Sequence, residues 1–196
     1  YNVKGLIQGQ QDCALSKNGT KQATALADGL KDNRIDKIYS SPLKRSFNTA
    51  QTINKYHNLI IQKVGAIKER AFGILENSHG KNVDQNNPGC LKDPYFKPRE
   101  GEDFPEVISR VSPFIKKVLS ENKKRILIVA HKVANLAMLK VLMDWNLEDA
   151  YAKKLDSTSI NIVSVDDNGT RLIKFNDTEH LKKANLKKIK EIKGIC

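Results

Sequence analysis

The stretch "RILIVAHKVANLAM", residues 125–138, decides the fold class of this 196-residue chain. Four apolar residues, Ile126 to Val129, precede His131 by one alanine, and apolar residues at helical spacing follow. A short continuous apolar run is typical of a strand that is buried in a parallel sheet. We therefore predict a buried strand over residues 125–130 and a buried helix over residues 133–145, with His131 at their junction.

Strand and helix patterns alternate over the rest of the chain. Ser16 precedes a helical pattern over residues 17–31, and a short strand is expected at Ile35–Ser40. Ser41 is placed to cap a second helix whose first position is Pro42. The remaining predicted elements are a strand over residues 59–64, a helix over 104–121 and a hairpin over 159–176 that turns at Asn168-Gly169. This alternation predicts an α/β fold with a largely parallel sheet.

The length and composition indicate a single domain over residues 1–196. Residues 77–101, rich in Asn, Pro, Gly and Lys, show no periodicity and are expected to form a lid or a surface loop. No apolar run approaches the roughly 20 residues that a membrane helix needs. Three cysteines without a CxxC pair suggest neither a disulfide framework nor a zinc site, so a reducing cytoplasm is the expected location.

The chain carries a formal net charge of +12, and six of its lysines lie from Lys182 onward. A basic chain can bind nucleic acid, an acidic membrane surface or anionic small molecules. No RNA- or DNA-binding motif supports the first of these partners, so nucleic acid is not expected. For the lysines near the end of the chain, the simplest interpretation is a solvated face.

Two sequence positions fit an anion-binding site. Ligands of parallel sheets lie beyond the carboxyl ends of the strands, and helix N-termini attract anions there. Arg45 lies in the first turn of the helix after strand 35–40, and His131 opens the helix after strand 125–130. The guanidinium of Arg45 can bind phosphate oxygens through two N–H groups. Either residue alone has a plainer interpretation, as a packed histidine or a solvated arginine, but the pair indicates a phosphate-binding α/β protein.

Six segments of the chain follow one another in an order that is typical of a known family. They are "YNVKGLIQGQQDCALSKNGTKQATALADGL" (1–30), "IYSSPLKRSFNTAQTI" (38–53), "IKERAFGILE" (67–76), "REGEDFPEVISRV" (99–111), "ILIVAHKVANLAML" (126–139) and "FNDTEHL" (175–181). With these segments the chain resembles the histidine phosphatase superfamily, which includes the cofactor-dependent phosphoglycerate mutases. The resemblance covers nearly the whole chain and implies a three-layer α/β/α sandwich of the phosphoglycerate mutase type. Its sheet would be mostly parallel, with a C-terminal antiparallel hairpin.

The resemblance implies a role for each matching residue. Members of the family begin with a strand that ends in Arg-His-Gly, whose histidine is the phosphorylated nucleophile, so we expect this histidine upstream of Tyr1. Arg45 and His131 would hold the phosphate oxygens, and Glu69 would protonate the leaving oxygen and then activate water. The expected substrate-binding residues are Asn2, Gln8, Gly9 and Lys132. No metal and no cofactor are expected, because cationic side chains take the place of Mg²⁺.

These roles predict a cytoplasmic, metal-independent phosphatase that hydrolyses a small phosphorylated metabolite through a phosphohistidine intermediate. The short segment 77–101 favours hydrolysis, because a mutase of this family goes with a longer insertion. Phosphoglycerate mutase-type transfer is one alternative. A non-catalytic phosphate- or partner-binding relative is another, if the chain truly starts at Tyr1, and a homodimer is left open.

Three positions depart from the family pattern. Lys132 stands where the family usually has glycine, Leu6 where it has arginine, and residues 75–77 read Leu-Glu-Asn instead of Trp-Glu-Gly. A lysine at 132 can add affinity for phosphate or point to solvent, and the change at 75–77 indicates a modified rim of the pocket. Glu102 is expected to anchor a loop.

Overall fold

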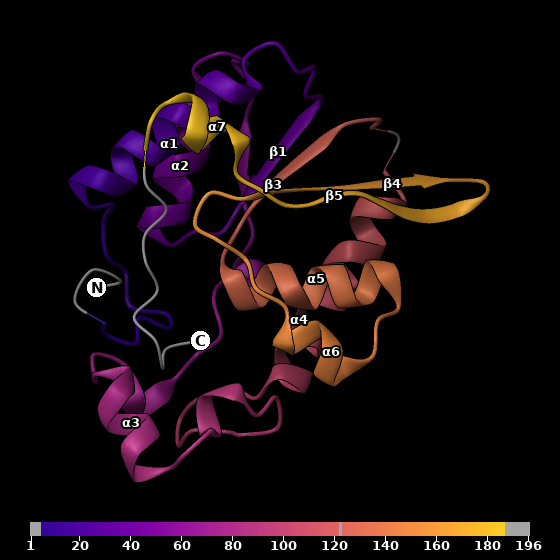
Figure 1. The fold of residues 1–196 in the computed structure, drawn as a ribbon. Helices are drawn as coiled ribbons and strands as arrows, with labels where there is room; N and C mark the ends of the chain where they lie inside the picture. Colours follow the sequence, from indigo (N-terminus) through magenta and orange to yellow (C-terminus); the bar gives the residue numbers. More distant parts are fainter. Residues whose placement is uncertain (1–4, 122, 187–196) are drawn as a thin grey trace.

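The computed structural model describes residues 5–121 and 123–186 (Figure 1). Its α-helices are α1 (Lys17–Leu30), α2 (Lys44–Asn54), α3 (Gly80–Asn86), α4 (Phe104–Leu119), α5 (Lys132–Met143), α6 (Leu147–Ala152) and α7 (Glu179–Lys183). Its strands are β1 (Lys37–Ser40), β2 (Ile61–Lys63), β3 (Ile126–Val129), β4 (Ile160–Asp166) and β5 (Gly169–Asp177). Between β2 and α4 lie the short 3₁₀ helices η2 (Gly65–Ile67), η3 (Gly73–Leu75) and η4 (Cys90–Lys92).

The parallel sheet has β1 at its centre. This strand pairs with β2 on one side and β3 on the other, so that Ile38 lies opposite both Ile61 and Leu127. β4 and β5 form an antiparallel hairpin of their own, in which Val163 lies opposite Leu172. Parallel strands that alternate with helices and end in an antiparallel hairpin confirm the predicted α/β fold.

Helices cover both faces of the parallel sheet. On one face, α1 and α2 enclose an apolar cluster that includes Leu127 and Val129 of β3. On the opposite face, α4, α5 and α6 enclose a larger cluster that includes Ile126 and Ile128 of the same strand. Successive side chains of a strand point to opposite faces, so β3 contributes to both cores by alternation. Figure 1 shows α1 and α2 on one side of the sheet and α4, α5 and α6 on the other, which is the three-layer arrangement that the resemblance implies.

The first two helices begin differently from one another. Ser16 caps α1 as predicted, and its hydroxyl accepts a hydrogen bond from the backbone N–H three residues on, at 3.0 Å. Helix α2 begins two residues later than predicted, at Lys44, and its N-cap is Leu43 instead of Ser41. The Ser41 hydroxyl accepts from the N–H of Leu43 at 3.3 Å and contacts His131, so it is engaged in the turn before the helix.

Strand β3 is less buried than the sequence predicts. All four of its residues are half-buried, although an apolar run of this kind is expected to be fully enclosed. The reason is a cavity of about 1280 Å³ that is lined on one side by residues 126–130 and on the other by residues 157–161. The cavity thus lies between β3 and the β4–β5 hairpin.

The hairpin turn and the end of α5 differ from the prediction by one or two residues, and β1, β2 and α4 are shorter than predicted. Asp166 pairs with Gly169, so residues 167–168 form the two-residue loop of the hairpin, and Gly169 opens β5 with φ +109°. The hairpin therefore turns one residue earlier than predicted. The helix predicted over residues 133–145 ends at Met143, and the separate helix α6 follows it.

Residues 77–101 are partly helical rather than irregular, because α3 and η4 lie in this segment. Figure 1 shows this segment, residues 77–101 with α3, as a lobe below the sheet. A small apolar core joins the lobe to the start of the described chain, and its members are Ile7, Phe72, Val83, Cys90 and Leu91. Since Phe72 and Leu91 also line the cavity, the lobe forms part of the cavity wall.

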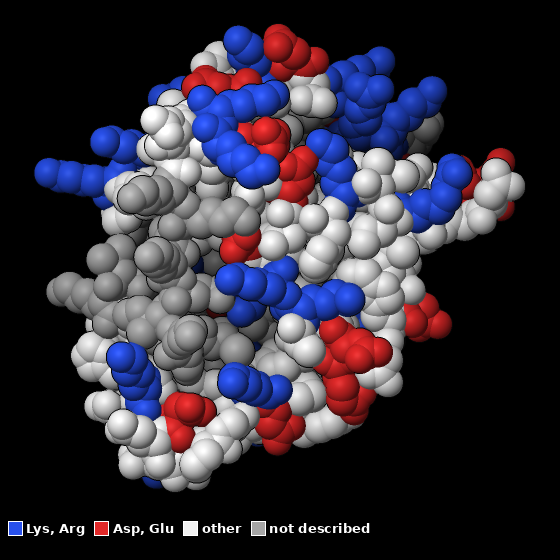
Figure 2. Space-filling model, in the orientation of Figure 1, with Lys and Arg blue, Asp and Glu red and all other residues white. Residues whose placement is uncertain are grey.

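Basic and acidic side chains are interspersed over the face shown in Figure 2. Basic side chains gather beside the loop between α4 and β3, where Lys117, Lys123 and Lys124 are exposed. Within residues 5–121 and 123–186, no helix is long and apolar enough to span a membrane. Four of the six lysines from Lys182 onward lie outside the described residues, so a solvated face there stays a prediction.

Candidate active site

The large cavity brings most of the predicted site residues to one place. Six of the seven line it, namely Gln8, Gly9, Arg45, Glu69, His131 and Lys132. The seventh, Asn2, lies outside the described residues. Arg45 comes from the first turn of α2, after β1, and His131 from the N-cap of α5, after β3. The two groups thus lie where the carboxyl ends of neighbouring parallel strands meet.

Arg45 holds the loop that precedes α1. Its guanidinium donates hydrogen bonds to the backbone carbonyls of Gly9 and Gln11, each at 2.8 Å. On the same loop, the Glu76 carboxylate accepts from the N–H of Gln10 at 2.8 Å and from the side-chain amide of Gln11 at 3.0 Å. Gly9 has φ +51°, and an added Cβ would meet Glu76 Oε1 at 2.0 Å, so the loop needs glycine here. A guanidinium has five N–H donors, so Arg45 can hold this loop and also bind an anion.

His131 is buried at the N-cap of α5 and contacts the turn that follows β1. Its Nε2 lies 2.8 Å from Ser41 Oγ, and only 7% of the residue is exposed. Burial lowers the pKa of the imidazole well below its usual value, and the nearby positive charges of Arg45 and Arg110 lower it further. We therefore expect a neutral imidazole at neutral pH when no anion is bound.

Glu69 lies against the N-terminus of α5. Its carboxylate accepts hydrogen bonds from the backbone N–H groups of Val133 at 3.1 Å, Ala134 at 3.3 Å and Arg70 at 2.9 Å. The helix N-terminus that the sequence assigned to a phosphate is therefore occupied by a carboxylate of the protein itself. Burial raises the pKa of this carboxyl, although the N–H groups of Arg70 and Ala134 and the charge of Arg45 act in the opposite direction. The carboxyl thus keeps a proton at higher pH than an ordinary glutamate, as a proton donor needs.

Lys132 and several apolar residues complete the wall of the cavity. Lys132 is the first residue of α5, directly after His131, and its side chain is half-buried. The wall also includes the apolar side chains of Leu6, Phe72 and Leu91. This part of the cavity wall is therefore partly apolar.

His180 of α7 is a second buried histidine, and it does not line the cavity. Its Nε2 lies 3.2 Å from Thr158 Oγ1. An added Cβ at Gly29 of α1 would lie 3.1 Å from the His180 Cβ, so α7 packs closely on α1 here. Burial lowers the pKa of the His180 imidazole, and this histidine serves packing between helices.

Cysteines and acidic side chains of the described residues are dispersed. No group of three or more His, Cys, Asp or Glu side chains in that part of the chain is placed to hold a metal ion. Cys13 and Cys90 are free thiols. Burial, assisted by the charge of Asp84, raises the pKa of the Cys90 thiol, so we expect it to act as a packing group in the small core.

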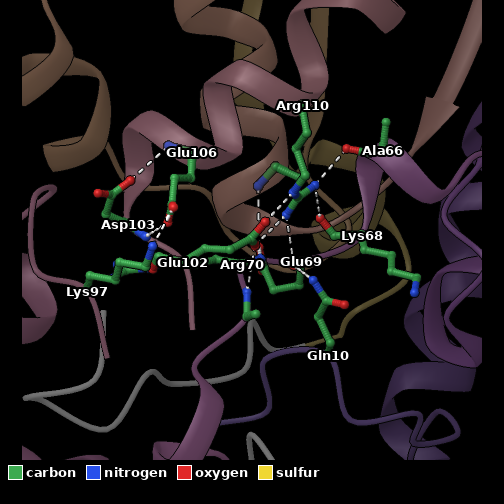
Figure 3. A network of polar contacts seen from close by, with 12 residues as sticks. Gln10, Ala66, Lys68, Glu69, Arg70, Lys97, Glu102, Asp103, Glu106 and Arg110 are labelled. Atoms are coloured by element: carbon green, nitrogen blue, oxygen red, sulfur yellow. Dashed lines mark hydrogen bonds and ion pairs between the residues drawn. The ribbon is translucent and has the colours of Figure 1, made fainter. Parts of the chain in front are cut away.

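Two parts of the site were not predicted from the sequence. Ser41, expected as a helix cap, contacts His131 instead. Arg110 of α4 donates to the backbone carbonyl of Glu69 at 3.0 Å and to both carboxylate oxygens of Glu102 (Figure 3). Glu102 anchors the loop that carries Glu69, as expected. The segment of residues 99–111, quoted above for the family resemblance, includes Arg110, but the packing of α4 is needed to see what this side chain contacts.

The chain matches the model of one protein family and is similar to proteins that are named phosphatases. Residues 1–178 match the family model described as "Histidine phosphatase superfamily (branch 1)". Phosphoserine phosphatase 1 of Hydrogenobacter thermophilus is 30% identical over 187 residues, which cover 92% of this chain and 89% of the relative. A metal-independent phosphoserine phosphatase of Arabidopsis thaliana is 29% identical over 192 residues, which cover 92% of this chain and 78% of the relative.

The fold also has a close match among solved structures. The structure titled "Mycobacterial hydrolase 1" superposes with a TM-score of 0.85, covering 91% of this chain and 93% of the other. The two sequences are 24% identical, so this match bears on the fold alone. It agrees with the α/β architecture of a parallel sheet followed by an antiparallel hairpin.

Proposed function

The chain belongs to the histidine phosphatase superfamily, branch 1, and on this basis we propose that it forms the active centre of a metal-independent phosphomonoester hydrolase for a small phosphorylated metabolite. The observation that carries the proposal is the presence of Arg45, Glu69 and His131 around one cavity, at the carboxyl ends of parallel strands. Two relatives, at 30% and 29% identity, are named phosphoserine phosphatases, so phosphoserine is the first substrate to test.

The proposal includes a histidine nucleophile from a segment that precedes Tyr1 in the complete protein. Strand β3 pairs with β1 along one edge, and among the described residues no strand pairs with its other edge. The cavity runs beside this second edge, along residues 126–130. Five residues of extended chain span about 17 Å, so a short strand from upstream can run the length of β3 inside the cavity. A histidine at the carboxyl end of that strand would lie next to Arg45 and His131.

In the first step of the proposed reaction, the nucleophilic nitrogen attacks phosphorus in line, and the bond from phosphorus to the leaving oxygen breaks. Arg45 holds phosphate oxygens through charge-assisted hydrogen bonds, and His131 donates another. Glu69 gives its proton to the leaving oxygen. In the second step, water attacks the phosphohistidine, Glu69 takes a proton from that water, and the phosphorus–nitrogen bond breaks to release inorganic phosphate.

The charge of His131 would change during this cycle. The imidazole is expected to be neutral in the empty site, because it is buried near the charges of Arg45 and Arg110. A bound phosphate dianion offsets those charges and favours the protonated imidazole. Since phosphoryl transfer depends mainly on positioning and charge neutralisation, Arg45 and a protonated His131 can supply what a metal ion supplies elsewhere.

The test uses the natural protein, including whatever its gene encodes before Tyr1. We expect this protein to release inorganic phosphate from p-nitrophenyl phosphate and from phosphoserine, at a rate that EDTA does not change. Residues 1–196 alone are expected to show little turnover, since they lack the proposed nucleophile. Loss of activity in EDTA, or equal activity of residues 1–196 alone, would contradict the mechanism. Transfer of the phosphoryl group to a second hydroxyl in place of water would support the mutase alternative.

A further inference from the structure

A second arginine, Arg110 of α4, uses its full hydrogen-bonding capacity on protein groups around Glu69 (Figure 3). Its Nε donates to Glu102 Oε1 at 2.7 Å and its Nη2 to Glu102 Oε2 at 3.0 Å. Its Nη1 donates to the carbonyls of Ala66 at 2.6 Å and Lys68 at 2.9 Å. Nη2 also donates to the carbonyl of Glu69 at 3.0 Å. A guanidinium has five N–H groups, so these five acceptors account for all of them.

Glu102 contacts the backbone that follows Glu69 in the sequence. Its Oε2 also accepts from the backbone N–H of Ala71 at 2.9 Å. Its backbone carbonyl accepts from the side chain of Arg70 at 2.7 Å. The backbone on both sides of Glu69 is therefore fixed, because Arg110 donates to carbonyls at and before Glu69 and Glu102 accepts from the N–H of Ala71.

The start of α4 sets the spacing between the two side chains. Asp103 and Glu106 form a capping box, with the Asp103 carboxylate accepting from the Glu106 N–H at 2.8 Å and the Glu106 carboxylate accepting from the Asp103 N–H at 3.1 Å. Glu102 precedes this cap directly, and Arg110 lies about two turns into the helix. Each side chain is 21% exposed, so their ion pair is largely shielded from solvent.

We propose that Arg110 and Glu102 form a clamp on residues 66–71 that aims the Glu69 carboxyl at the N-terminus of α5, and so at the leaving oxygen. The proposal rests on the role of Glu69 as proton donor in the proposed function. Arg110 and Glu102 are positioning residues, because Arg110 does not line the cavity and its donors are taken by protein acceptors. The clamp thus gives two residues behind the cavity wall an influence on the rate of proton transfer.

Arg110→Lys tests the clamp with the positive charge retained. An ammonium presents three donors from one point, and it cannot replace a planar fork that contacts five acceptors. We expect kcat to fall about 10- to 100-fold, the scale expected when a reacting group is misplaced by about 1 Å. We expect KM to change by less than about threefold, because the groups proposed to bind phosphate are unchanged. Glu102→Gln keeps the size of the side chain and one acceptor oxygen. We expect its kcat to lie between those of Arg110→Lys and the unsubstituted protein.

The matched control is Lys97→Gln. Lys97 pairs with Glu106 at 2.5 Å at the start of the same helix, but the two side chains are 52% and 43% exposed. An exposed ion pair contributes little, so we expect kcat and KM of this variant to stay within about twofold of the unsubstituted protein.

A double-mutant cycle with Glu69→Gln separates an effect on the position of Glu69 from a general effect on the fold. If the clamp acts through the Glu69 proton, Arg110→Lys lowers kcat in the natural sequence but has almost no further effect once Glu69 is Gln. If the clamp only supports the fold, Arg110→Lys lowers kcat by the same factor in both backgrounds. Equal factors would overturn the proposal.

An NMR titration does not depend on turnover and tests the contact between the Glu69 carboxyl and the start of α5 directly. In the complete natural chain, an NMR titration follows the Glu69 carboxyl carbon and the backbone amides of Val133 and Ala134. We expect all three signals to share one midpoint, above the usual glutamate value of 4.5. In Arg110→Lys we expect the midpoint to move toward 4.5 and the two amides to lose their response, while Lys97→Gln behaves like the natural protein. Of the two arginines whose charges act on the pKa of Glu69, Arg45 is unchanged in these variants, and Arg110→Lys retains a positive charge at position 110.

A failure of the clamp can be distinguished from a failure of the proposed function. If the natural protein hydrolyses no phosphomonoester, the proposed function fails, and the NMR titration still decides the clamp. If the protein is active but Arg110→Lys matches Lys97→Gln in kcat and in the Glu69 midpoint, the clamp is overturned and the proposed function stands. If circular dichroism shows that Arg110→Lys does not fold, the same comparison is made with Glu102→Gln.

Discussion

Arg45 and Arg110 both lie close enough to lower the pKa of the Glu69 carboxyl, yet the protein holds them in different ways. Arg45 lines the cavity and donates to two backbone carbonyls of one loop. Arg110 lies outside the cavity wall and donates to five acceptors on two segments. The number of protein acceptors and access to the cavity distinguish the two arginines, whereas their charge is the same.

The hydrogen-bond partners of each arginine determine what it can do. A guanidinium that faces a cavity with donors to spare is suited to bind an anion. A guanidinium whose donors are all taken by protein carbonyls and a carboxylate has no N–H group left for a ligand, so its hydrogen bonds fix the protein around it. Substitutions in the two regions should therefore differ in kind, with anion affinity lost in the Arg45 region and proton transfer slowed in the Arg110 region.

The largest effect is expected from Arg45→Ala in the complete natural protein. We expect kcat/KM for phosphoserine to fall about 10³-fold, because an anchored charge partner of the phosphate is lost. Inhibition by inorganic phosphate should weaken in parallel, whereas Arg110→Lys should leave that inhibition unchanged. The matched control is Lys44→Ala, which removes an exposed side chain that pairs with Asp12 at 3.3 Å. Equal loss of phosphate affinity in Arg45→Ala and Arg110→Lys would remove the distinction between the two regions.

His131→Ala should have the next largest effect. We expect turnover to fall about 10²-fold, because a hydrogen-bond donor to the phosphate is lost from a buried position. His180→Gln is the control, since His180 is also buried but does not line the cavity, and it should leave kcat nearly unchanged. Similar turnover in the two variants would show that the buried histidine at the cavity has no special role.

The third prediction concerns the pH dependence of anion affinity at Arg45 and His131. Its expected size is smaller than the losses of activity given above. An anion beside His131 favours the protonated imidazole, so binding takes up protons and affinity rises as pH falls. We expect sulfate, whose own charge is constant over this range, to bind more tightly at about pH 6 than at about pH 8. Calorimetry on the natural protein and on His131→Gln should give the variant a smaller dependence. Identical pH dependence in both proteins would contradict the assignment of His131 to the anion site.

The smallest effect concerns stability and His180. Burial places the pKa of His180 in the folded protein below its ordinary value of 6.5, so the unfolded chain binds a proton more readily. The contribution of His180 to the stability of the folded protein is therefore present above about pH 6.5 and is lost progressively as pH falls below that value. Thermal unfolding should show a lower Tm on mild acidification, and a weaker dependence in His180→Gln. An equal dependence in the two proteins would show that His180 does not contribute.

Local sequence pattern predicts a large part of the fold. Ser16 caps α1 as predicted, and His131 stands at the predicted junction of β3 and α5. These features depend on hydrophobic periodicity and on the capping preferences of short polar side chains, which a single sequence displays. The start of α2 is not predicted correctly, because the Ser41 hydroxyl forms contacts with Leu43 and His131 that involve the turn and a distant element.

Contacts between distant segments set the rest of the site. The Arg110 side chain reaches the carbonyl of Glu69 across 41 positions of sequence, and no periodicity records such a pair. The half-exposure of β3 likewise depends on what lies beside its second edge, which the apolar run alone cannot specify. The strand-end positions suggest Arg45 and His131, the family resemblance adds Glu69, and the contacts that hold these three residues are seen only in the fold.

If Glu69 protonates the leaving oxygen in a phosphatase site, the activity lost in Glu69→Gln must depend on the leaving group of the substrate. The measurement is kcat/KM of the complete natural protein and of this variant, with phosphoserine and with p-nitrophenyl phosphate. An alkoxide leaving group needs a proton and a nitrophenolate does not, so we expect a loss of about 10³-fold for phosphoserine and less than about 10-fold for p-nitrophenyl phosphate. Equal losses for the two substrates would contradict the role of Glu69 as proton donor.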